Sequence, residues 1–351
     1  MKPAEHLLGL TVGSGWTVID KLVKKPGESG GHFSTGYIVE AADGKKAFLK
    51  AIDFSVPPGH PDPARFLQEL TEAFNFERDI LQQCKDDRLR RVVVAIEDGR
   101  VDVPAPHAGL VQFLIFELAE GTLHHRSRFA IAFQHAWSFR VAHHVATGLW
   151  QVHKQNIAHQ DLKFSNVLVF NGTGSKIGDF GRASLFGKPP MRHDALMVAG
   201  DRTYAPPEQL YGHVHSDWRT RRFGCDMYLL GSLLFQMFTN VPMTGQWLSH
   251  LHRTHHPGMG GWGGTYVQVL PYVRDAMDRA IVDAQATVPE PYRDEFFRMV
   301  RELCEPELEK RGHPRGMHSP ANQYSMERYI SSFNLLAYKA EVAMRVAAKS
   351  P

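Results

Sequence analysis

The stretch 159–181 reads HQDLKFSNVLVFNGTGSKIGDFG and is the most informative part of the sequence. It contains two short motifs, HQDLKFSN and DFG, with a run typical of a β-strand between them. Phosphoryl transfer needs a carboxylate that accepts a hydroxyl proton, and oxygen ligands that hold magnesium against a triphosphate. Asp161 is a candidate for the proton-accepting carboxylate, and Asn166 and Asp179 are candidates for the metal ligands.

The order and spacing of these motifs resemble the catalytic loop and the magnesium-binding motif of the protein kinases. Either motif alone would be weak evidence, but the pair is specific, and the resemblance extends over about residues 16–318. It implies an α+β, two-lobed protein-kinase-like fold that binds ATP and Mg²⁺ in the cleft between its lobes. It also implies a serine/threonine protein kinase, which moves the γ-phosphate of Mg-ATP to a hydroxyl of a protein substrate.

The composition is that of a globular protein without an obvious nucleic-acid or membrane partner. The chain has 351 residues, 43% of them hydrophobic, enough to bury one large core or two lobes. Its formal net charge of +3 is too balanced to indicate nucleic-acid binding. The three cysteines show no paired or metal-type spacing, and the longest apolar run, 227–238, is too short to span a bilayer. The N-terminus lacks the apolar core of a signal peptide, so we expect a cytoplasmic protein.

Residues 1–117 are predicted to form a nucleotide-binding N-terminal lobe of strands with one main helix. Apolar residues at helical spacing predict the helix at 63–83. A period of two and β-branched or aromatic runs predict strands at 16–23, 37–41, 46–52, 92–96 and 111–117. Asp43-Gly44 indicates a hairpin, and we expect Asp98-Gly99 and a Pro-rich turn to join the last two strands.

Residues 118–318 are predicted to form a helical C-terminal lobe, and 319–351 a C-terminal extension. The stretch 239–290 does not resemble the usual helices of the kinase lobe, so it is an atypical insertion, either a docking surface or a structural elaboration. Its histidine-rich part, 250–256, is predicted to be an exposed loop rather than a metal site. Apolar spacings of three and four over 325–347 predict an amphipathic helix, which packs on its own lobe or serves a partner.

By resemblance, four residues are assigned to catalysis. Lys50 ends a predicted strand, where the family places its phosphate-binding lysine, and Glu77 on the following helix is its acidic partner. The alternative for Glu77 is an ordinary solvated helix charge. Asp161 orients and deprotonates the acceptor hydroxyl. Lys163 neutralises the transferring phosphoryl group, and its position is typical of serine/threonine-directed enzymes.

The stretch 29–36 corresponds by resemblance to the phosphate-covering glycine-rich loop. Serines 29 and 34 stand where the family usually has its first and third glycines, so the loop departs from the usual pattern. A serine makes the close approach of backbone to phosphate less free. The residues of this loop assigned to the nucleotide are Gly30, Gly31, Phe33, Ser34 and Gly36.

The stretch 114–121 corresponds to the hinge of the kinases. Phe116 stands at the position that limits access behind the adenine. Glu117 and Ala119 would offer backbone groups to the base edge, and Glu120 would reach the ribose. The alternative is a buried edge strand leaving the sheet.

The roof of the adenine pocket carries a paired departure from the family pattern. The usual valine and alanine are replaced by Gly36 and Phe48, an exchange that roughly conserves volume. We expect Phe48 to cover the adenine, Gly36 to make room for its ring, and Leu168 to form the floor. The competing hypothesis is that Phe48 fills the pocket and excludes nucleotide.

Two further departures concern the catalytic loop and the activation segment. Gln160 replaces the arginine that commonly precedes the catalytic aspartate and pairs with a phosphate on this segment. We therefore expect activity that does not depend on phosphorylation of the activation segment. Asp201 replaces a threonine and is expected either to pair with Lys163 or to repel Asp161.

Three residues further along the chain favour a protein substrate. Asp226 matches the buried helix that anchors the catalytic loop, and Arg311 is expected to pair with Glu208. Small-molecule kinases of related fold lack this set. The alternatives are a pseudokinase-type nucleotide-binding scaffold and, less favoured, a small-molecule kinase.

Overall fold

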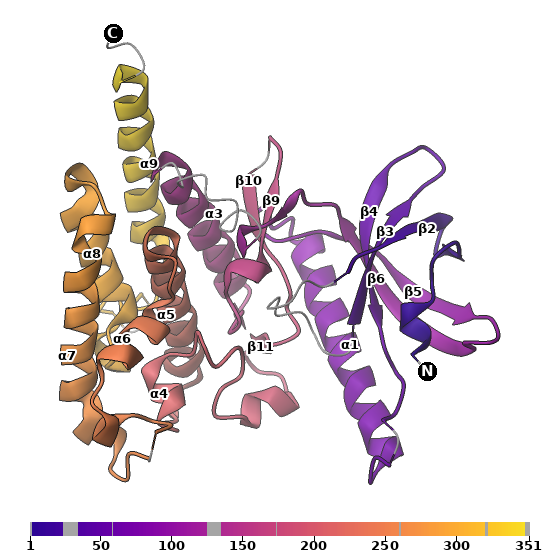
Figure 1. The fold of residues 1–351 in the computed structure, drawn as a ribbon, viewed down its shortest axis with the longest axis horizontal. Helices are drawn as coiled ribbons and strands as arrows, with labels where there is room; N and C mark the ends of the chain where they lie inside the picture. Colours follow the sequence, from indigo (N-terminus) through magenta and orange to yellow (C-terminus); the bar gives the residue numbers. More distant parts are fainter. Residues whose placement is uncertain are drawn as a thin grey trace. The chain divides into compact units, whose positions relative to one another are not determined.

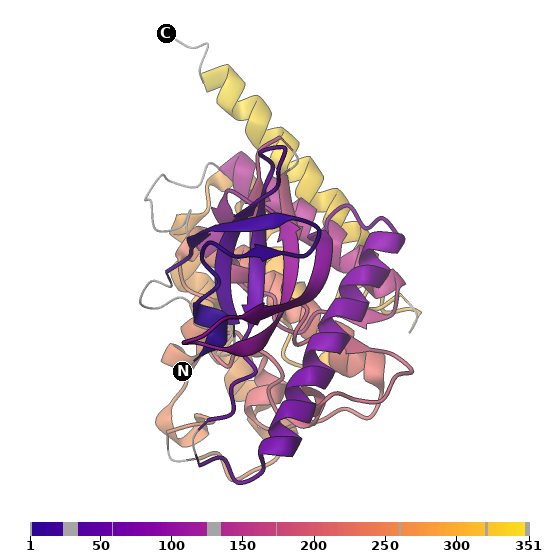
Figure 2. The same cartoon turned by 90° about the vertical axis from the view of Figure 1, so that its right-hand side faces the viewer.

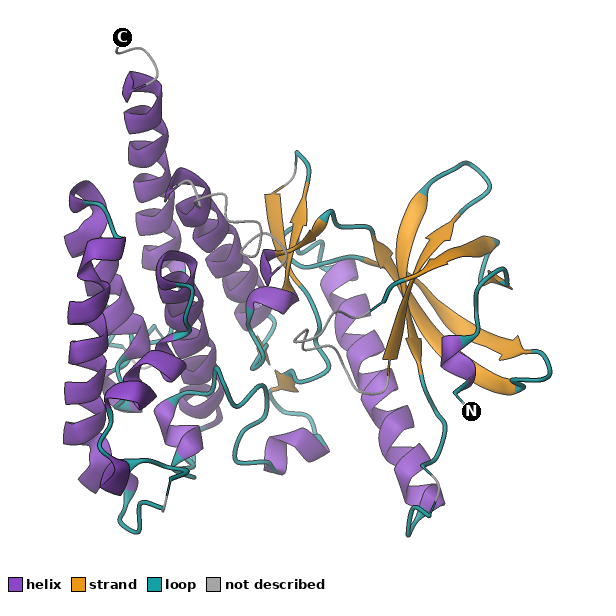
Figure 3. Cartoon of the chain, viewed as in Figure 1, coloured by secondary structure: helices purple, strands orange, loops and turns teal. Residues whose placement is uncertain are grey.

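The computed structural model describes residues 2–23, 34–57, 59–124, 135–172, 174–259, 261–319 and 322–347. The chain divides into two compact units. Unit 1 is Met1–Thr122 with Leu168–Gly181, and unit 2 is Leu123–Val167 with Arg182–Pro351. Figure 3 shows the large sheet in unit 1 and the long helices of unit 2, which confirms the predicted α+β class.

The main element of unit 1 is an antiparallel sheet in the order β1-β2-β3-β4-β6-β5 (Figure 1). Its strands are β1 (Thr11–Val12), β2 (Trp16–Lys21), β3 (Ser34–Glu40), β4 (Lys46–Ile52), β5 (Ala95–Val103) and β6 (Gly109–Glu117). Along β4, Ala47, Leu49 and Ala51 are fully buried, whereas Phe48 and Lys50 are half-buried. Because side chains alternate between the faces of a strand, Phe48 and Lys50 share the face opposite the core.

Helix α1 (Pro63–Asp86) runs beside this sheet (Figure 2). Asp62 caps its start by accepting a hydrogen bond from the Arg65 backbone N–H at 3.0 Å, and Pro63 stands at the first helical position. The unit is completed by the turn η1 (Pro3–Glu5) and by a second sheet in the order β10-β9-β7. Its strands are β7 (Gly121–Thr122), β9 (Val167–Phe170) and β10 (Gly174–Ile177).

The prediction that Asp98-Gly99 forms a turn is wrong, because both residues lie within β5. Gly99 is opposite Phe113 on β6, and a Cβ atom at position 99 would come within 2.8 Å of the Phe113 ring. The glycine therefore makes room for a fully buried aromatic ring rather than reversing the chain. The chain reverses instead between Val103 and Gly109.

Unit 2 is mainly helical. Its helices are α3 (His135–Lys154), α4 (Pro207–Leu210), α5 (Trp218–Thr239), α6 (Met243–His250), α7 (Tyr266–Ala284), α8 (Glu290–Cys304) and α9 (Glu327–Ala347). Short 3₁₀ turns join them: η2 (Phe164–Asn166), η3 (Arg192–Ala195), η4 (Arg253–His255), η5 (Gln285–Thr287) and η6 (Leu308–Lys310). Two short strands, β8 (Ile157–Ala158) and β11 (Ser184–Leu185), pair antiparallel. Helix α5 is buried along most of its length and packs against α3, α6 and α8.

The predicted C-terminal amphipathic helix is α9, which packs along α3 of its own unit. Arg140 of α3 donates hydrogen bonds to Asn334 and Glu341, each at 2.6 Å, and Trp150 donates to Glu327 at 3.2 Å. Of the two predicted uses of this helix, packing on its own lobe is therefore the one observed.

The stretch 239–290, predicted to be an atypical insertion, forms α6, η4, α7 and η5, and helices α6 and α7 pack against each other. Its histidine-rich part is not only a loop, since His250 ends α6 and the His255 ring, in η4, stacks on Tyr272 with centroids 3.7 Å apart. Among the residues that the structure describes, no group of three or more His, Cys, Asp or Glu side chains could hold a metal ion. Within the same residues, no helix is both long enough and apolar enough to cross a membrane.

Candidate functional site

In unit 1, Lys50 of β4 pairs with Glu77 of α1 and lies near Asp179. The Lys50 Nζ atom is 2.8 and 2.9 Å from the two carboxylate oxygens of Glu77 and 3.4 Å from Oδ1 of Asp179. Glu77 is buried on the same helix face as Phe74 and Leu81, so it is not a solvated helix charge. Burial by itself lowers the pKa of Lys50, but the Glu77 and Asp179 carboxylates outweigh this effect and raise it. The Lys50 ammonium is therefore permanently charged near neutral pH.

Asp179 has an uncommon backbone conformation. Its φ angle is +62°, in the left-handed region that residues other than glycine rarely adopt. Its side chain remains 45% exposed, unlike that of Glu77. Strained residues of this kind concentrate at functional sites, where the surrounding structure holds them in place.

The ring of Phe48 occupies the space beside Gly36, as the paired exchange predicts. A Cβ atom at Gly36 would lie 2.9 Å from the Phe48 ring, and the Phe48 and Phe116 ring centroids are 6.2 Å apart. Phe48 and Phe116 are directly opposite each other on β4 and β6. Leu168 of β9 is half-buried and lies close to Gly178.

The strand that leads into the predicted hinge ends at Glu117, and its carboxylate is held by a lysine that sequence reasoning missed. The two carboxylate oxygens of Glu117 lie 2.7 and 2.8 Å from the Lys176 Nζ atom, and one also accepts from the Val94 backbone N–H. The Glu117 backbone N–H donates to the Val94 carbonyl at 3.2 Å. Because the Glu117 backbone N–H is engaged in this way, the Glu117 carbonyl is the backbone group that could contact the edge of the adenine base. Glu120 lies outside the strand, and its backbone N–H donates to the Val169 carbonyl at 2.9 Å.

Only part of the glycine-rich loop lies within the residues that the structure describes. Gly30, Gly31 and Phe33 lie outside the described residues, whereas Ser34 and Gly36 belong to β3.

In unit 2, helix α5 holds the catalytic loop through Asp226. Its fully buried carboxylate accepts hydrogen bonds from the backbone N–H groups of His159 and Gln160, at 2.8 and 2.7 Å. The His153 ring lies 2.8 Å from the same carboxylate. The predicted anchoring of the loop by Asp226 is confirmed. Gln160 adopts a φ angle of +62°, which turns the chain immediately before Asp161.

Asp161, Lys163 and Asn166 form one cluster of polar side chains. The Asn166 side-chain N–H group donates to the Asp161 carbonyl at 2.7 Å and to its carboxylate at 3.1 Å. The Lys163 Nζ atom lies 3.1 Å from the Asp161 Oδ2 atom. The Asn166 Oδ1 atom accepts a hydrogen bond from the Ser165 hydroxyl at 3.1 Å and keeps a second lone pair, which could bind a metal ion.

The structure favours pairing over repulsion for Asp201. The carboxylate of Asp201 lies 3.5 Å from the Lys163 Nζ atom, and the Asp201 backbone N–H donates to the Asp161 carboxylate at 2.9 Å. Thr203 donates to Asp201 through its backbone N–H and its hydroxyl, at 3.0 and 2.7 Å. Burial by itself raises the pKa of Asp201, but the Thr203 hydrogen bonds and the Lys163 charge outweigh this effect and lower it. The sequence analysis did not predict these contacts between Thr203 and Asp201, although an aspartate two residues before a threonine is a common turn signal.

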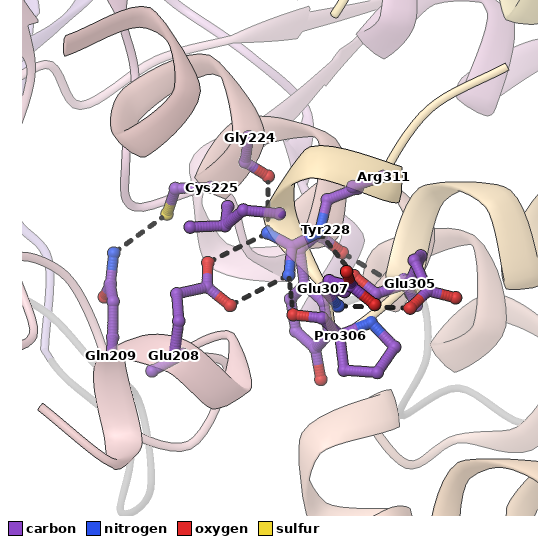
Figure 4. A network of polar contacts seen from close by, with 12 residues as sticks. Glu208, Gln209, Gly224, Cys225, Tyr228, Glu305, Pro306, Glu307 and Arg311 are labelled. Carbon is purple, nitrogen blue, oxygen red and sulfur yellow. Dashed lines mark hydrogen bonds and ion pairs between the residues drawn. The ribbon is translucent and has the colours of Figure 1, made fainter. Parts of the chain in front are cut away.

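The predicted pair of Glu208 and Arg311 is confirmed (Figure 4). The two guanidinium Nη atoms of Arg311 donate to the two carboxylate oxygens of Glu208 at 2.9 and 2.8 Å. Arg311 also donates to the carbonyls of Gly224 and Glu305, and its side chain is fully buried. Burial by itself lowers the pKa of Arg311, but the Glu208 carboxylate outweighs it and raises the pKa. This bidentate pair ties the end of the activation segment to the helical unit.

Comparison with known proteins agrees with this geometry. Residues 37–312 match the family model described as "Protein kinase domain". A probable serine/threonine-protein kinase of Clostridium perfringens is 33% identical over 139 residues, which are 38% of this chain and 19% of that protein. Serine/threonine-protein kinase PLK4 of Drosophila melanogaster is 29% identical over 132 residues, covering 37% of this chain and 16% of that protein. The matched part of the chain thus spans less than a fifth of the length of either relative.

Proposed function

The chain belongs to the protein kinase family, and from this premise we propose that it is an active serine/threonine protein kinase that uses Mg-ATP. The observation that carries the proposal is the cluster of Asp161, Lys163 and Asn166, in which a carboxylate and an ammonium group lie 3.1 Å apart. Phosphoryl transfer requires mainly positioning and charge stabilisation from the protein, and this cluster offers a proton acceptor beside a fixed positive charge.

Mg²⁺ fits the residues proposed to hold it, Asn166 and Asp179. Both offer oxygen atoms, which Mg²⁺ prefers, and the Asn166 Oδ1 atom keeps one lone pair beyond the one that accepts from the Ser165 hydroxyl. When bound, Mg²⁺ would neutralise charge on the phosphates.

The residues of each unit have separate tasks in the proposed reaction. Lys50 binds the α- and β-phosphates, and the ion pair with Glu77 holds its ammonium group in position. Asp161 orients the acceptor hydroxyl and accepts its proton, while Lys163 stabilises the charge of the transferring phosphoryl group. The salt bridge between Lys163 and Asp201 supports this arrangement, since it fixes the lysine near the proton acceptor.

The proposed nucleotide contacts are those expected from the resemblance. Phe48 covers the adenine, Leu168 forms the floor, and Phe116 closes the space behind the base. The phosphate-covering loop and the hinge supply the remaining contacts, from Gly30, Gly31, Phe33, Ser34, Gly36, Glu117, Ala119 and Glu120. The close packing of Phe48 over Gly36 supports a shaped roof, because the ring takes space that a larger residue at position 36 would fill.

We also propose that activity is independent of phosphorylation in the activation segment. Gln160 is uncharged and stands where the family commonly has an arginine, so a phosphate on the segment gains no ionic partner at that position.

The alternative from another class is a nucleotide-binding scaffold without catalysis. Phe48 is the observation that favours it, because a large ring in the adenine roof restricts the pocket. A small-molecule kinase is disfavoured by the Glu208–Arg311 pair, which supports a protein substrate.

The test is transfer of γ-labelled phosphate from Mg-ATP to a generic acceptor protein, together with calorimetric titration of Mg-ATP. We expect transfer by the wild-type protein, loss of transfer in Asp161→Ala, and Mg-ATP binding by both. Binding without transfer in the wild type would favour the scaffold. Absence of both would indicate that Phe48 excludes the nucleotide.

A further inference from the structure

The activation segment of this chain, residues 182–208, contains a buried carboxylate. Asp194 lies in η3, and its Oδ1 atom is 2.7 Å from a guanidinium nitrogen of Arg222 in helix α5. The two side chains are only 4% and 3% exposed. Arg222 also donates to the Asp194 carbonyl at 3.0 Å, so it contacts both the side chain and the backbone of Asp194.

The same guanidinium group reaches the catalytic loop. Arg222 donates a short hydrogen bond to the side-chain oxygen of Gln160, the residue before Asp161. The Gln160 side-chain N–H group donates to the Arg182 carbonyl at 3.2 Å and lies 3.5 Å from the Asp194 carboxylate. One arginine from α5 therefore connects the activation segment to the residue that precedes the proposed proton acceptor.

The positive charge of Arg222 explains why position 160 carries a neutral glutamine rather than an arginine. A buried guanidinium group is costly unless a carboxylate compensates it, and Asp194 supplies that carboxylate for Arg222. An arginine at position 160 would add a second positive charge beside the same carboxylate. Glutamine instead accepts from Arg222 with its oxygen and donates to the segment with its nitrogen.

Neighbouring contacts hold the same part of the segment. The Asp194 carboxylate accepts from the Met191 backbone N–H at 3.0 Å, and the His193 ring lies 2.7 Å from the Ala183 carbonyl. Strand β11 of the segment pairs with β8, which directly precedes the catalytic loop. Besides the ion pair, hydrogen bonds from backbone and side-chain groups therefore also hold this part of the segment.

We infer that Asp194 and Arg222 are positioning residues that form a built-in ion pair and hold the activation segment against the catalytic loop without any added phosphate. The inference rests on the proposed function and deepens it, because it names the groups that replace a phosphate and its arginine. Neither residue is assigned a role in the chemical step. They act through Gln160 on the position of Asp161.

The test compares Asp194→Asn and Arg222→Lys with the wild-type protein by hydrogen exchange of the amides in 183–195. Asp294→Asn is the matched control, because Asp294 is an exposed aspartate of the same unit. We expect exchange in 183–195 to become at least about tenfold faster in both variants and to be unchanged in the control. The double variant D194N/R222Q removes both charges, so it leaves no unpaired buried charge should a single variant fail to fold.

Steady-state kinetics provide the second readout. We expect kcat to fall by about 100-fold in Asp194→Asn, with the KM for ATP within about twofold of wild type, since misplacement of Asp161 affects the chemical step. Asp194→Glu, which keeps the charge, should recover part of kcat. Unchanged exchange in 183–195 in the folded variants would overturn the inference. A wild-type protein without kinase activity would instead refute the proposed function, and the exchange comparison would still decide the inference.

Discussion

Phe48 packs so closely over Gly36 that a Cβ atom at position 36 would lie 2.9 Å from the Phe48 ring. The two positions are therefore coupled, and a larger residue at one needs a smaller residue at the other. We expect Gly36→Val to destabilise the protein by about 1–3 kcal/mol, as is typical of overpacking. Urea unfolding measures the loss, and calorimetry measures the accompanying change in Mg-ATP affinity.

The double variant Gly36→Val/Phe48→Ala is the control for this prediction. It restores the volumes usual in the family, and it should regain stability relative to Gly36→Val alone. Additive losses in the double variant would contradict the coupling.

A second prediction concerns the Lys50–Glu77 pair. Glu77→Gln removes the charge that holds the half-buried Lys50 ammonium group, so we expect kcat/KM to fall by about 100-fold. Since the Lys50 side chain is 19% exposed, we expect a stability loss of about 1–3 kcal/mol, less than for a fully buried pair. Glu72→Gln is the matched control, because Glu72 is an exposed acid of the same helix. An equal effect of the two substitutions on kcat/KM would refute the pairing role.

A third prediction follows from the lowered pKa of Asp201. Its ordinary value is 3.8, and the hydrogen bonds from Thr203 and the charge of Lys163 lower it in the folded protein. A carboxylate whose pKa is lowered by folding contributes its full stabilisation when the pH is above its pKa in the unfolded chain. This stabilisation is lost as the pH falls through its lower pKa in the folded protein. Asp201→Asn should therefore be less stable than wild type at pH 7, and the difference should shrink below about pH 3.8. Urea midpoints across this pH range measure it, and a constant difference would contradict the assignment.

A fourth prediction contrasts two arginine–glutamate pairs in unit 2. Glu208→Gln leaves the fully buried Arg311 without its counter-charge, so we expect a loss of about 3–5 kcal/mol. The control is Glu305→Gln, whose partner Arg274 is 41% exposed, and here we expect at most about 1 kcal/mol. Chemical unfolding of both variants gives the comparison. Similar losses of stability in the two variants would show that burial does not determine how much the Glu208–Arg311 pair contributes to the free energy of unfolding.

The parts of this protein that could be predicted from sequence are those with a local signal. The period of two in 46–52 fixes β4, and so places Phe48 and Lys50 on one face. The apolar face of α1 carries one acid, Glu77, and a buried acid needs a nearby cation. The contact between Lys50 and Glu77 was therefore predictable from periodicity combined with the family pattern.

The parts that could not be predicted depend on contacts between residues distant in the chain. Asp98-Gly99 has the composition of a turn, and only the buried ring of Phe113 explains its place inside β5. Arg222 lies in an apolar helix, and no local pattern indicates that its partner is Asp194. The contact between Glu117 and Lys176 is of the same kind.

The most direct test of the central claim is identification of the phosphorylated residue in an acceptor protein by mass spectrometry after incubation with Mg-ATP. The wild-type protein and the control Asp294→Asn should both produce phosphoserine or phosphothreonine, and Asp161→Asn should produce neither while still binding Mg-ATP. Equal phosphorylation by wild type and Asp161→Asn, or none by a wild-type protein that binds Mg-ATP, would contradict the account.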